Sequence, residues 1–121
     1  MKVNNIKKSF NTINGEIEAI KNIDLEIKDG EFIAIVGPSG CGKSTLLSIL
    51  ANLEEASSGN IIYDNSNPKI GYMLQDDALL DHLTIMDNAC LGLKILHLYN
   101  DTNVKYAEDL LDKYDLLNFK D

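Results

Sequence analysis

The sequence is poor in cysteine and has no long apolar run, and each absence excludes a class of protein. Its two cysteines, Cys41 and Cys90, lie far apart without a CxxC pair or a metal-ligand spacing, which favours free thiols in a reducing compartment. No apolar run approaches the ~20 residues that a membrane-spanning helix needs. The basic start, Met1–Lys8, is followed by no apolar segment of the kind found in signal peptides. We therefore expect a cytoplasmic protein without a transmembrane segment of its own.

Positive charge is also scarce. The chain has 11 Lys and Arg residues against 19 Asp and Glu residues, which gives a net charge of −8. This balance argues against nucleic acid as the main partner. The composition is otherwise that of a globular protein, with 45% hydrophobic and 25% charged residues, and 121 residues are enough for one domain with a core. An acidic protein of this kind must bind phosphate through backbone N–H groups and individually placed lysines.

What the sequence does contain is a phosphate-binding motif. Gly37–Thr45 (GPSGCGKST) matches G-x-x-x-x-G-K-[ST], the P-loop, with Gly37, Gly42, Lys43 and Ser44 at the fixed positions. Because glycines lack Cβ, such a loop can bring several backbone N–H groups to a polyphosphate, and the next helix adds its free N–H groups and its dipole. Lys43 supplies a positive charge for the outer phosphates, and the Ser44 hydroxyl can bind Mg²⁺.

The residues on either side of the motif have the pattern that a P-loop requires. Phe32–Val36 is a continuous apolar run of strand length, which predicts a buried parallel strand leading into the loop. Ser44–Leu53 then has helical spacing, and Asn52 suits a left-handed helix terminus. The apolar positions of this helix are Leu46, Leu47, Ile49, Leu50 and Leu53. Strand, loop and helix in this order favour a P-loop over a glycine-rich surface turn.

Two short strands are expected before the P-loop strand. Residues 2–8 form the first candidate, followed by a turn at Asn11–Gly15. In residues 23–27 apolar and charged side chains alternate, which predicts a half-exposed strand that turns at Asp29–Gly30 into the buried strand 32–36. An antiparallel hairpin would thus lead into the P-loop strand, which is unusual in a plain βαβ nucleotide-binding unit.

Further short strands and then helices are expected after the P-loop helix. The strands are Asn60–Asp64 and Ile70–Leu74, joined by the loop Asn65–Pro68 and followed by polar Gln75–Asp77. From Thr84, a candidate N-cap, the period becomes helical, and Asn100–Thr102 ends this helix and caps the next. The apolar faces are Ile85, Ala89, Leu93 and Leu96 in the first helix and Val104, Ala107, Leu110, Leu111 and Tyr114 in the second.

Together these stretches resemble the ATP-binding subunit of an ABC transporter, over essentially the whole chain. Gly37–Thr45 is a form of the loop common in importer ATPases. Ile70–Gln75 (IGYMLQ), Leu79-Leu80 and Leu83–Asn88 (LTIMDN) resemble the Q-loop and the entry to the helical subdomain. The sequence of Gly71–Asp77, together with Gly92-Leu93 and Leu110–Phe119 near the end of the chain, is most similar to the nitrate, sulfonate and taurine importer group.

The resemblance implies an α/β fold, a P-loop NTPase with an antiparallel β subdomain and the start of a helical subdomain, incomplete. Residues 1–77 would be the nucleotide-binding portion and residues 78–121 the start of the helical subdomain.

The resemblance also implies roles for individual residues. Phe10 matches the aromatic residue that stacks on adenine, and its alternative is a core residue at a strand end. Gln75 matches the glutamine that reaches the metal and the attacking water, and its alternative is a solvated loop residue. Lys43 would bind the phosphates and Ser44 the Mg²⁺. The residues expected at ATP are Phe10, Gly37, Pro38, Ser39, Gly40, Cys41, Gly42, Lys43, Ser44 and Thr45.

Three family motifs have no match in these residues: the LSGGQ signature, the Walker B run with its catalytic glutamate, and the switch histidine, whose position neither His82 nor His97 occupies. The sequence thus resembles the first half of an ATPase domain.

The leading hypothesis is an importer ATPase that binds ATP and Mg²⁺ and hydrolyses ATP in a full-length dimer. Its partners would be membrane permease subunits and a second ATPase subunit, at the inner face of the cell membrane. The alternative is a nucleotide-binding fragment without hydrolysis. A GTPase is disfavoured because no N-K-x-D segment is present.

Overall fold

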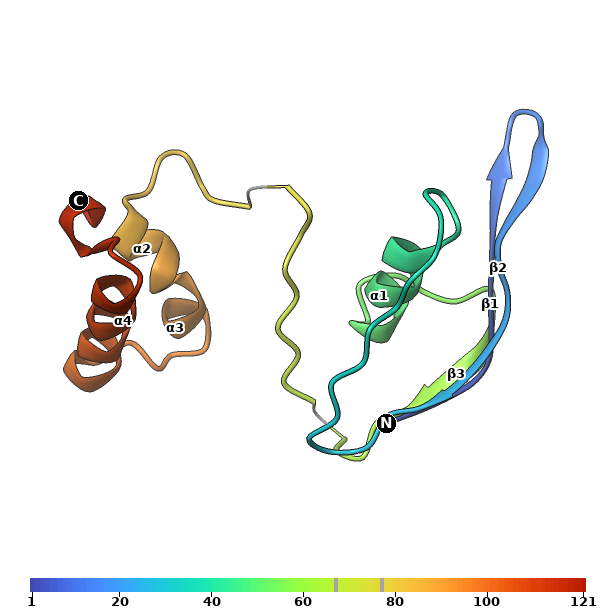
Figure 1. Ribbon diagram of the computed structural model, residues 1–121, viewed down its shortest axis with the longest axis horizontal. Helices are drawn as coiled ribbons and strands as arrows, with labels where there is room; N and C mark the ends of the chain where they lie inside the picture. The colour runs from blue at the N-terminus through green and yellow to red at the C-terminus, as the bar shows by residue number, and fades with distance from the viewer. Residues whose placement is uncertain (67, 77) are drawn as a thin grey trace. The chain divides into compact units, whose positions relative to one another are not determined.

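The structure is a computed structural model that describes residues 1–66, 68–76 and 78–121 (Figure 1). The chain divides into two compact units, Met1–Tyr72 and Met73–Asp121. Asn67, in the expected loop Asn65–Pro68, and Asp77, at the end of Gln75–Asp77, lie outside the described residues. The nucleotide-binding portion expected for residues 1–77 stays a prediction.

The first unit contains an antiparallel sheet of three strands in the order β2-β1-β3. The strands are β1 (Lys2–Thr12), β2 (Gly15–Glu26) and β3 (Ser58–Ile62). The hairpin turn between β1 and β2 lies at residues 13–14, within the expected turn, and the Thr12 hydroxyl donates a hydrogen bond to the carbonyl oxygen of Gly15 at 2.7 Å. Both strands extend further than the sequence pattern indicated.

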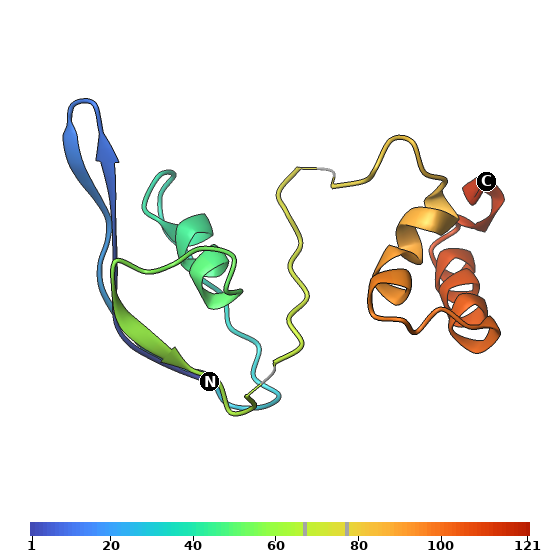
Figure 2. The ribbon, with the colours of Figure 1, turned by 180° about the vertical axis from the view of Figure 1, so that it is seen from behind.

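Helix α1 (Lys43–Leu50) packs against one face of this sheet (Figure 2). The shared core consists of Val3, Ile6, Ile20, Leu46 and Ile49. Val3 and Ile6 are three residues apart, so a regular strand would place them on opposite faces. A register irregularity between them, with Asn5 at a φ of 50°, brings both to the α1 side. Burying each such side chain contributes about 1.5–3 kcal/mol, which makes this face the main source of stability in the unit.

Two of the expected strands are absent from the described residues. Residues 32–36 and 70–74 have no regular secondary structure, and the hairpin partner of β2 is β1 rather than residues 32–36. The prediction of a buried P-loop strand is therefore wrong here: Phe32 is 96% exposed and Val36 is 89% exposed. An apolar run becomes a buried strand only where neighbouring strands supply ladder hydrogen bonds, and no strand that the structure describes pairs with either segment.

The second unit is helical. It contains α2 (Ile85–Ala89), α3 (Leu91–Ile95), α4 (Asp101–Lys113) and a 3₁₀ turn, η1 (Leu117–Phe119). Both expected N-caps are confirmed: Thr84 Oγ1 accepts a hydrogen bond from the N–H of Asp87, and Asn100 Oδ1 accepts one from the N–H of Asn103. The single helix expected after Thr84 is wrong, because the chain breaks between α2 and α3 at Cys90, which is 1% exposed.

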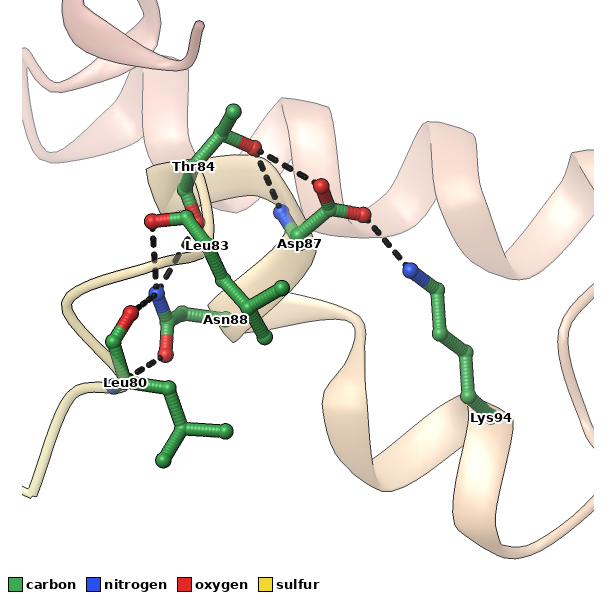
Figure 3. A network of polar contacts seen from close by, with 6 residues as sticks. All are labelled: Leu80, Leu83, Thr84, Asp87, Asn88 and Lys94. Carbon is green, nitrogen blue, oxygen red and sulfur yellow. Dashed lines mark hydrogen bonds and ion pairs between the residues drawn. The ribbon is translucent and has the colours of Figure 1, made fainter.

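The α2 start is held by the Asn88 side chain (Figure 3). Its Oδ1 accepts a hydrogen bond from the N–H of Leu80 at 2.8 Å, and its amide nitrogen donates to the carbonyl oxygens of Leu80, Leu83 and Thr84. The neighbouring Asp87 carboxylate lies 2.6 Å from the Lys94 ammonium. One amide side chain therefore closes the loop that enters the helical unit.

No helix among the described residues is both long and apolar enough to cross a membrane.

Candidate nucleotide-binding site

The site is built on the loop that precedes α1. Gly42 is the N-cap of this helix, and its φ of 91° lies in the left-handed region. A glycine cap has no side chain to bind the first N–H groups, and the first helical turn contains no acidic residue. The N–H groups of Lys43, Ser44 and Thr45 therefore lack both an intrahelical partner and a side-chain cap. Together with the helix dipole, they form an end that favours an anion.

Gly42 also explains how closely the loop approaches the sheet. A Cβ atom on this residue would lie 2.6 Å from the carbonyl oxygen of Ala19 in β2. No L-residue fits at that separation without a shift of backbone. The glycine that the phosphate motif requires is thus also the residue that lets the loop pack against β2.

Lys43 extends across its own loop. Its Nζ donates hydrogen bonds to the carbonyl oxygens of Gly37 at 2.9 Å and Pro38 at 2.7 Å, and lies 3.6 Å from the Sγ of Cys41. An ammonium group has three donors and no acceptor, so these contacts hold it at the loop mouth, against the loop's own carbonyl oxygens. The loop thus contains both fixed N–H donors and a positioned cation.

A cavity of about 380 Å³ lies between this loop and β2. Its walls include Ala19, Ile20 and Lys21 from β2 and Cys41, Gly42 and Lys43 from the loop. This volume falls within the range of small-molecule sites, about 300–1,000 Å³. The cavity therefore joins a phosphate-binding end to an apolar wall.

Phe10 lies on β1 and is not one of the residues that line this cavity. It pairs with Ile17, which directly precedes the cavity residue Glu18. The Lys8 ammonium lies 4.9 Å from the Phe10 ring centroid and also forms an ion pair with Glu54 at 3.0 Å, beyond the end of α1. Phe10 is 39% exposed. Its ring remains accessible for stacking, and the role at adenine stays a prediction.

Gln75 belongs to a different unit from the other predicted residues. It is exposed and belongs to the second unit, whereas the loop and Phe10 belong to the first. The structure brings together Gly37–Thr45 on one loop and helix start, with Ser44 exposed at the first helical turn. The roles of Ser44 and Gln75 at a metal stay predictions.

Two features near the site have no signal in the sequence. One is the wall formed by β2, since residues 15–22 contain no motif and acquire a role only through their contact with the loop. The other is the hydrogen bond between Ser48 and Tyr72 at 3.1 Å, which joins α1 to the segment that leads to Gln75. Neither could be found without the tertiary packing.

The residues present fit a nucleoside triphosphate. The loop has open N–H groups at a helix start and a lysine at the loop mouth, and its Gly42 lies so close to β2 that a Cβ atom would not fit. Within the described residues, no group of three or more His, Cys, Asp and Glu side chains is arranged to hold a metal ion. The Ser44 hydroxyl is a hard oxygen ligand of the kind that suits Mg²⁺ when phosphate oxygens complete the shell.

An antiparallel sheet, a glycine-rich loop and an α-helix with an open N-terminus define a P-loop nucleotide-binding domain. A family profile described as "ABC transporter" matches residues 20–121, and the chain belongs to this family.

Curated relatives include import proteins from several bacteria. The chain is 35% identical to the aliphatic sulfonates import ATP-binding protein SsuB of Zymomonas mobilis, over 98% of the chain and 47% of that protein. It is 39% identical to the sulfate/thiosulfate import ATP-binding protein CysA of Neisseria meningitidis, over 78% of the chain and 28% of that protein. It is 45% identical to the sn-glycerol-3-phosphate import ATP-binding protein UgpC of Brucella abortus, over 76% of the chain and 28% of that protein.

Solved structures agree with this assignment. The dimeric bacterial ABC transporter cassette MJ0796 superposes with a TM-score of 0.85 at 32% identity, over 99% of the chain and 60% of that cassette. A post-hydrolysis state of the same cassette, bound to ADP and Pi, has a TM-score of 0.84 at 32% identity, over 98% of the chain and 59% of the cassette. The chain thus spans less than two thirds of these relatives, and corresponds to their N-terminal portion.

Proposed function

We propose that the chain is the ATP-binding portion of an ABC importer ATPase, which powers solute uptake by hydrolysing ATP in a full-length dimer. The observation that carries the proposal is the open start of α1, with the Lys43 ammonium held 2.7 Å from the Pro38 carbonyl oxygen at the loop mouth. Relatives named as import ATP-binding proteins support the direction of transport. The similarity to SsuB and the wording of Gly71–Asp77 support a solute of the nitrate, sulfonate or taurine kind.

In the proposed mechanism the protein mainly positions the nucleotide and stabilises charge. The Phe10 ring stacks on adenine. The backbone N–H groups of the loop bind the phosphates, and Lys43 exchanges carbonyl partners for the outer phosphate oxygens. Ser44 and Gln75 would hold Mg²⁺, which would neutralise part of the phosphate charge. The Gln75 amide orients the attacking water.

The partners follow from the same proposal. A dimeric cassette among the solved neighbours supports a second ATPase subunit, and the family supports membrane permease subunits. Such partners would place the protein at the cytoplasmic face of the cell membrane.

A second candidate function is nucleotide binding without hydrolysis. It is favoured by the absence, within the printed residues, of a Walker B carboxylate and an LSGGQ segment. Both candidate functions require the P-loop, so only a measurement of ATP hydrolysis distinguishes them.

One experiment tests the binding that both functions share. A charge-assisted contact contributes about 1.5–3 kcal/mol, so Lys43→Ala should weaken a fluorescent ATP analogue roughly 10- to 150-fold. Lys105→Ala removes the same charge from the exposed surface of α4 and should leave the dissociation constant unchanged. Equal affinities in wild type and Lys43→Ala would refute the site.

A phosphate-release assay on the same samples separates the two functions. We expect the 121-residue chain to release no phosphate above the Lys43→Ala background, because the printed residues include no carboxylate for the attacking water. Release that is lost in Lys43→Ala would instead show a complete hydrolytic site in these residues.

A further inference from the structure

One lysine of the first unit is held by two contacts rather than extended into solvent. The Lys8 side chain, in β1, is 14% exposed, and its ammonium group donates a hydrogen bond to the Glu55 carbonyl oxygen at 2.7 Å and lies 3.0 Å from the Glu54 carboxylate. Lysine side chains are mostly exposed in proteins, as the neighbouring Lys7 is. The position of the Lys8 ammonium is therefore fixed by the fold.

Both partners of Lys8 belong to the segment that follows the P-loop helix. Glu54 and Glu55 lie between the end of α1 and the start of β3. The same segment is joined to β1 through its backbone, since the N–H of Ser57 donates a hydrogen bond to the carbonyl oxygen of Lys7 at 2.8 Å. The helix that begins at the phosphate-binding loop thus leads, at its other end, to the two groups that hold Lys8.

The Lys8 ammonium also lies over the ring of Phe10. Its nitrogen is 4.9 Å from the ring centroid, within the distance of about 6 Å at which a cation is attracted to an aromatic face. Side chains two residues apart on a strand point to the same face of the sheet, so this contact follows from the spacing of the two residues in β1. One face of the ring is covered in this way, and with Phe10 39% exposed the ring still has open surface.

A ring that is held in this way is prepared for stacking. A free aromatic side chain at a strand end adopts several rotamers, and binding a base to it requires that freedom to be lost. A cation on one face restricts the ring before any ligand arrives, and it leaves the opposite face for a flat, apolar partner. The cost of ordering the ring is then part of the folding of the first unit and does not reduce the affinity for the base.

We infer that Lys8 is a positioning residue for the adenine base of ATP: held by Glu54 and Glu55, its ammonium covers one face of the Phe10 ring and leaves the other face for the base. The inference rests on the proposed function, because it needs Phe10 to stack on adenine. It concerns only residues of the first unit. Lys8 does not contact ATP in this arrangement and acts through the ring.

The contact between Lys8 and Phe10 can be tested by NMR without nucleotide. Protons above an aromatic face are shielded by the ring current, so the Lys8 Hε signals should lie upfield of those of Lys7. Phe10→Leu removes the ring and should return the Lys8 signals to the position of the Lys7 signals. Equal Hε shifts of Lys8 and Lys7 in the wild type would overturn the inference.

The role in binding requires two ligands that share their phosphates. Inorganic tripolyphosphate has three phosphates without adenosine, so the ratio of its dissociation constant to that of ATP, measured by calorimetry, gives the nucleoside preference of the site. Stacking a base on an aromatic side chain corresponds to a factor of roughly 5–150 in affinity, and Phe10→Ala should reduce the nucleoside preference by a factor in this range. A contact between a cation and a ring corresponds to a factor of roughly 2–5, and we expect Lys8→Met to reduce the nucleoside preference by this factor.

Three further variants separate positioning from charge and from stability. Lys7→Met removes the same charge from an exposed neighbouring position and should keep the full nucleoside preference. Lys8→Arg keeps a cation that can lie over a ring and should keep most of this preference. Lys8→Met in the Phe10→Ala background should cause no further loss, because a residue that acts only through the ring then has nothing to position.

The outcomes distinguish the inference from the proposed function. If Lys43→Ala weakens ATP binding and Phe10→Ala lowers the nucleoside preference, while Lys8→Met keeps that preference, the inference is wrong and the proposed function stands. If Lys8→Met weakens ATP and tripolyphosphate equally, Lys8 supports the fold alone and the inference is again wrong. If Phe10→Ala leaves the nucleoside preference unchanged, the inference fails while phosphate binding through Lys43 stands. If the wild type binds no ATP, both fail together.

Discussion

The close approach of the P-loop to β2 predicts that two glycines of the same loop differ in their tolerance of alanine. Gly40 and Gly42 both have positive φ, at 78° and 91°. Placing an L-residue in the left-handed region lowers the free energy of unfolding by about 1–2 kcal/mol. Replacing glycine by alanine also reduces the conformational entropy of the unfolded chain, which restores roughly 0.4–1 kcal/mol. A Cβ at Gly40 would meet nothing within 4 Å, so Gly40→Ala has only this backbone cost, a net of about 0–1.6 kcal/mol.

Gly42→Ala has the same backbone cost and a steric one. Its Cβ would lie 2.6 Å from the Ala19 carbonyl oxygen and 3.4 Å from Ile20 Cγ1. The first is a backbone atom of β2, so the contact cannot be relieved by a rotamer change. Overpacking of this kind costs about 1–3 kcal/mol, so Gly42→Ala should lose about 1–3 kcal/mol more than Gly40→Ala.

The assay must report on the first unit alone, because the chain has two units. Urea titrations followed by the methyl signals of Ile20, Leu46 and Ile49 measure the unfolding of its core. The methyl signals of Leu111, buried in the second unit, provide an internal reference that neither substitution should shift. If the two variants lose the same free energy of unfolding, the proximity of Gly42 to β2 is refuted.

Two further predictions concern single side chains. Cys41 is exposed and Cys90 is buried, so iodoacetamide should modify Cys41 much faster than Cys90. Mg-ATP should slow the modification of Cys41 alone. Equal modification rates of Cys41 with and without nucleotide, measured by mass spectrometry, would contradict this prediction. The Lys94 ammonium, hydrogen-bonded to Asp87, holds the pKa of that carboxyl below its usual 3.8. The pair therefore stabilises the second unit above pH 3.8, and this contribution is lost as the pH falls through the lowered pKa. Lys94→Gln should raise the pKa of Asp87 in a carboxyl ¹³C titration, and an unmoved midpoint would show that the contact is not formed.

Features that depend on a few neighbouring residues could be predicted from the sequence. The N-caps at Thr84 and Asn100 follow from side chains that reach an N–H three residues on, and both are present. Asn52 has the left-handed φ expected at the helix end, 57°. The motif Gly37–Thr45 likewise determines its own loop and the start of α1.

Features that depend on distant partners could not be predicted. The apolar run Phe32–Val36 has the composition of a buried strand, yet pairing requires neighbours that the run itself does not specify. The irregularity that turns both Val3 and Ile6 to the core depends on contacts with β2 and β3. In the site, Ala19 gains its role only from its contact with Gly42.

The Asn88 side chain makes the helical unit sensitive to a chemical change at a single amide. Its amide nitrogen donates to three carbonyl oxygens, those of Leu80, Leu83 and Thr84. Deamidation would replace that nitrogen with a carboxylate oxygen, which accepts hydrogen bonds but donates none. A negative charge would then face three carbonyl oxygens, and the loop they hold would open. A covalent change at this one side chain would thus loosen the entry to α2.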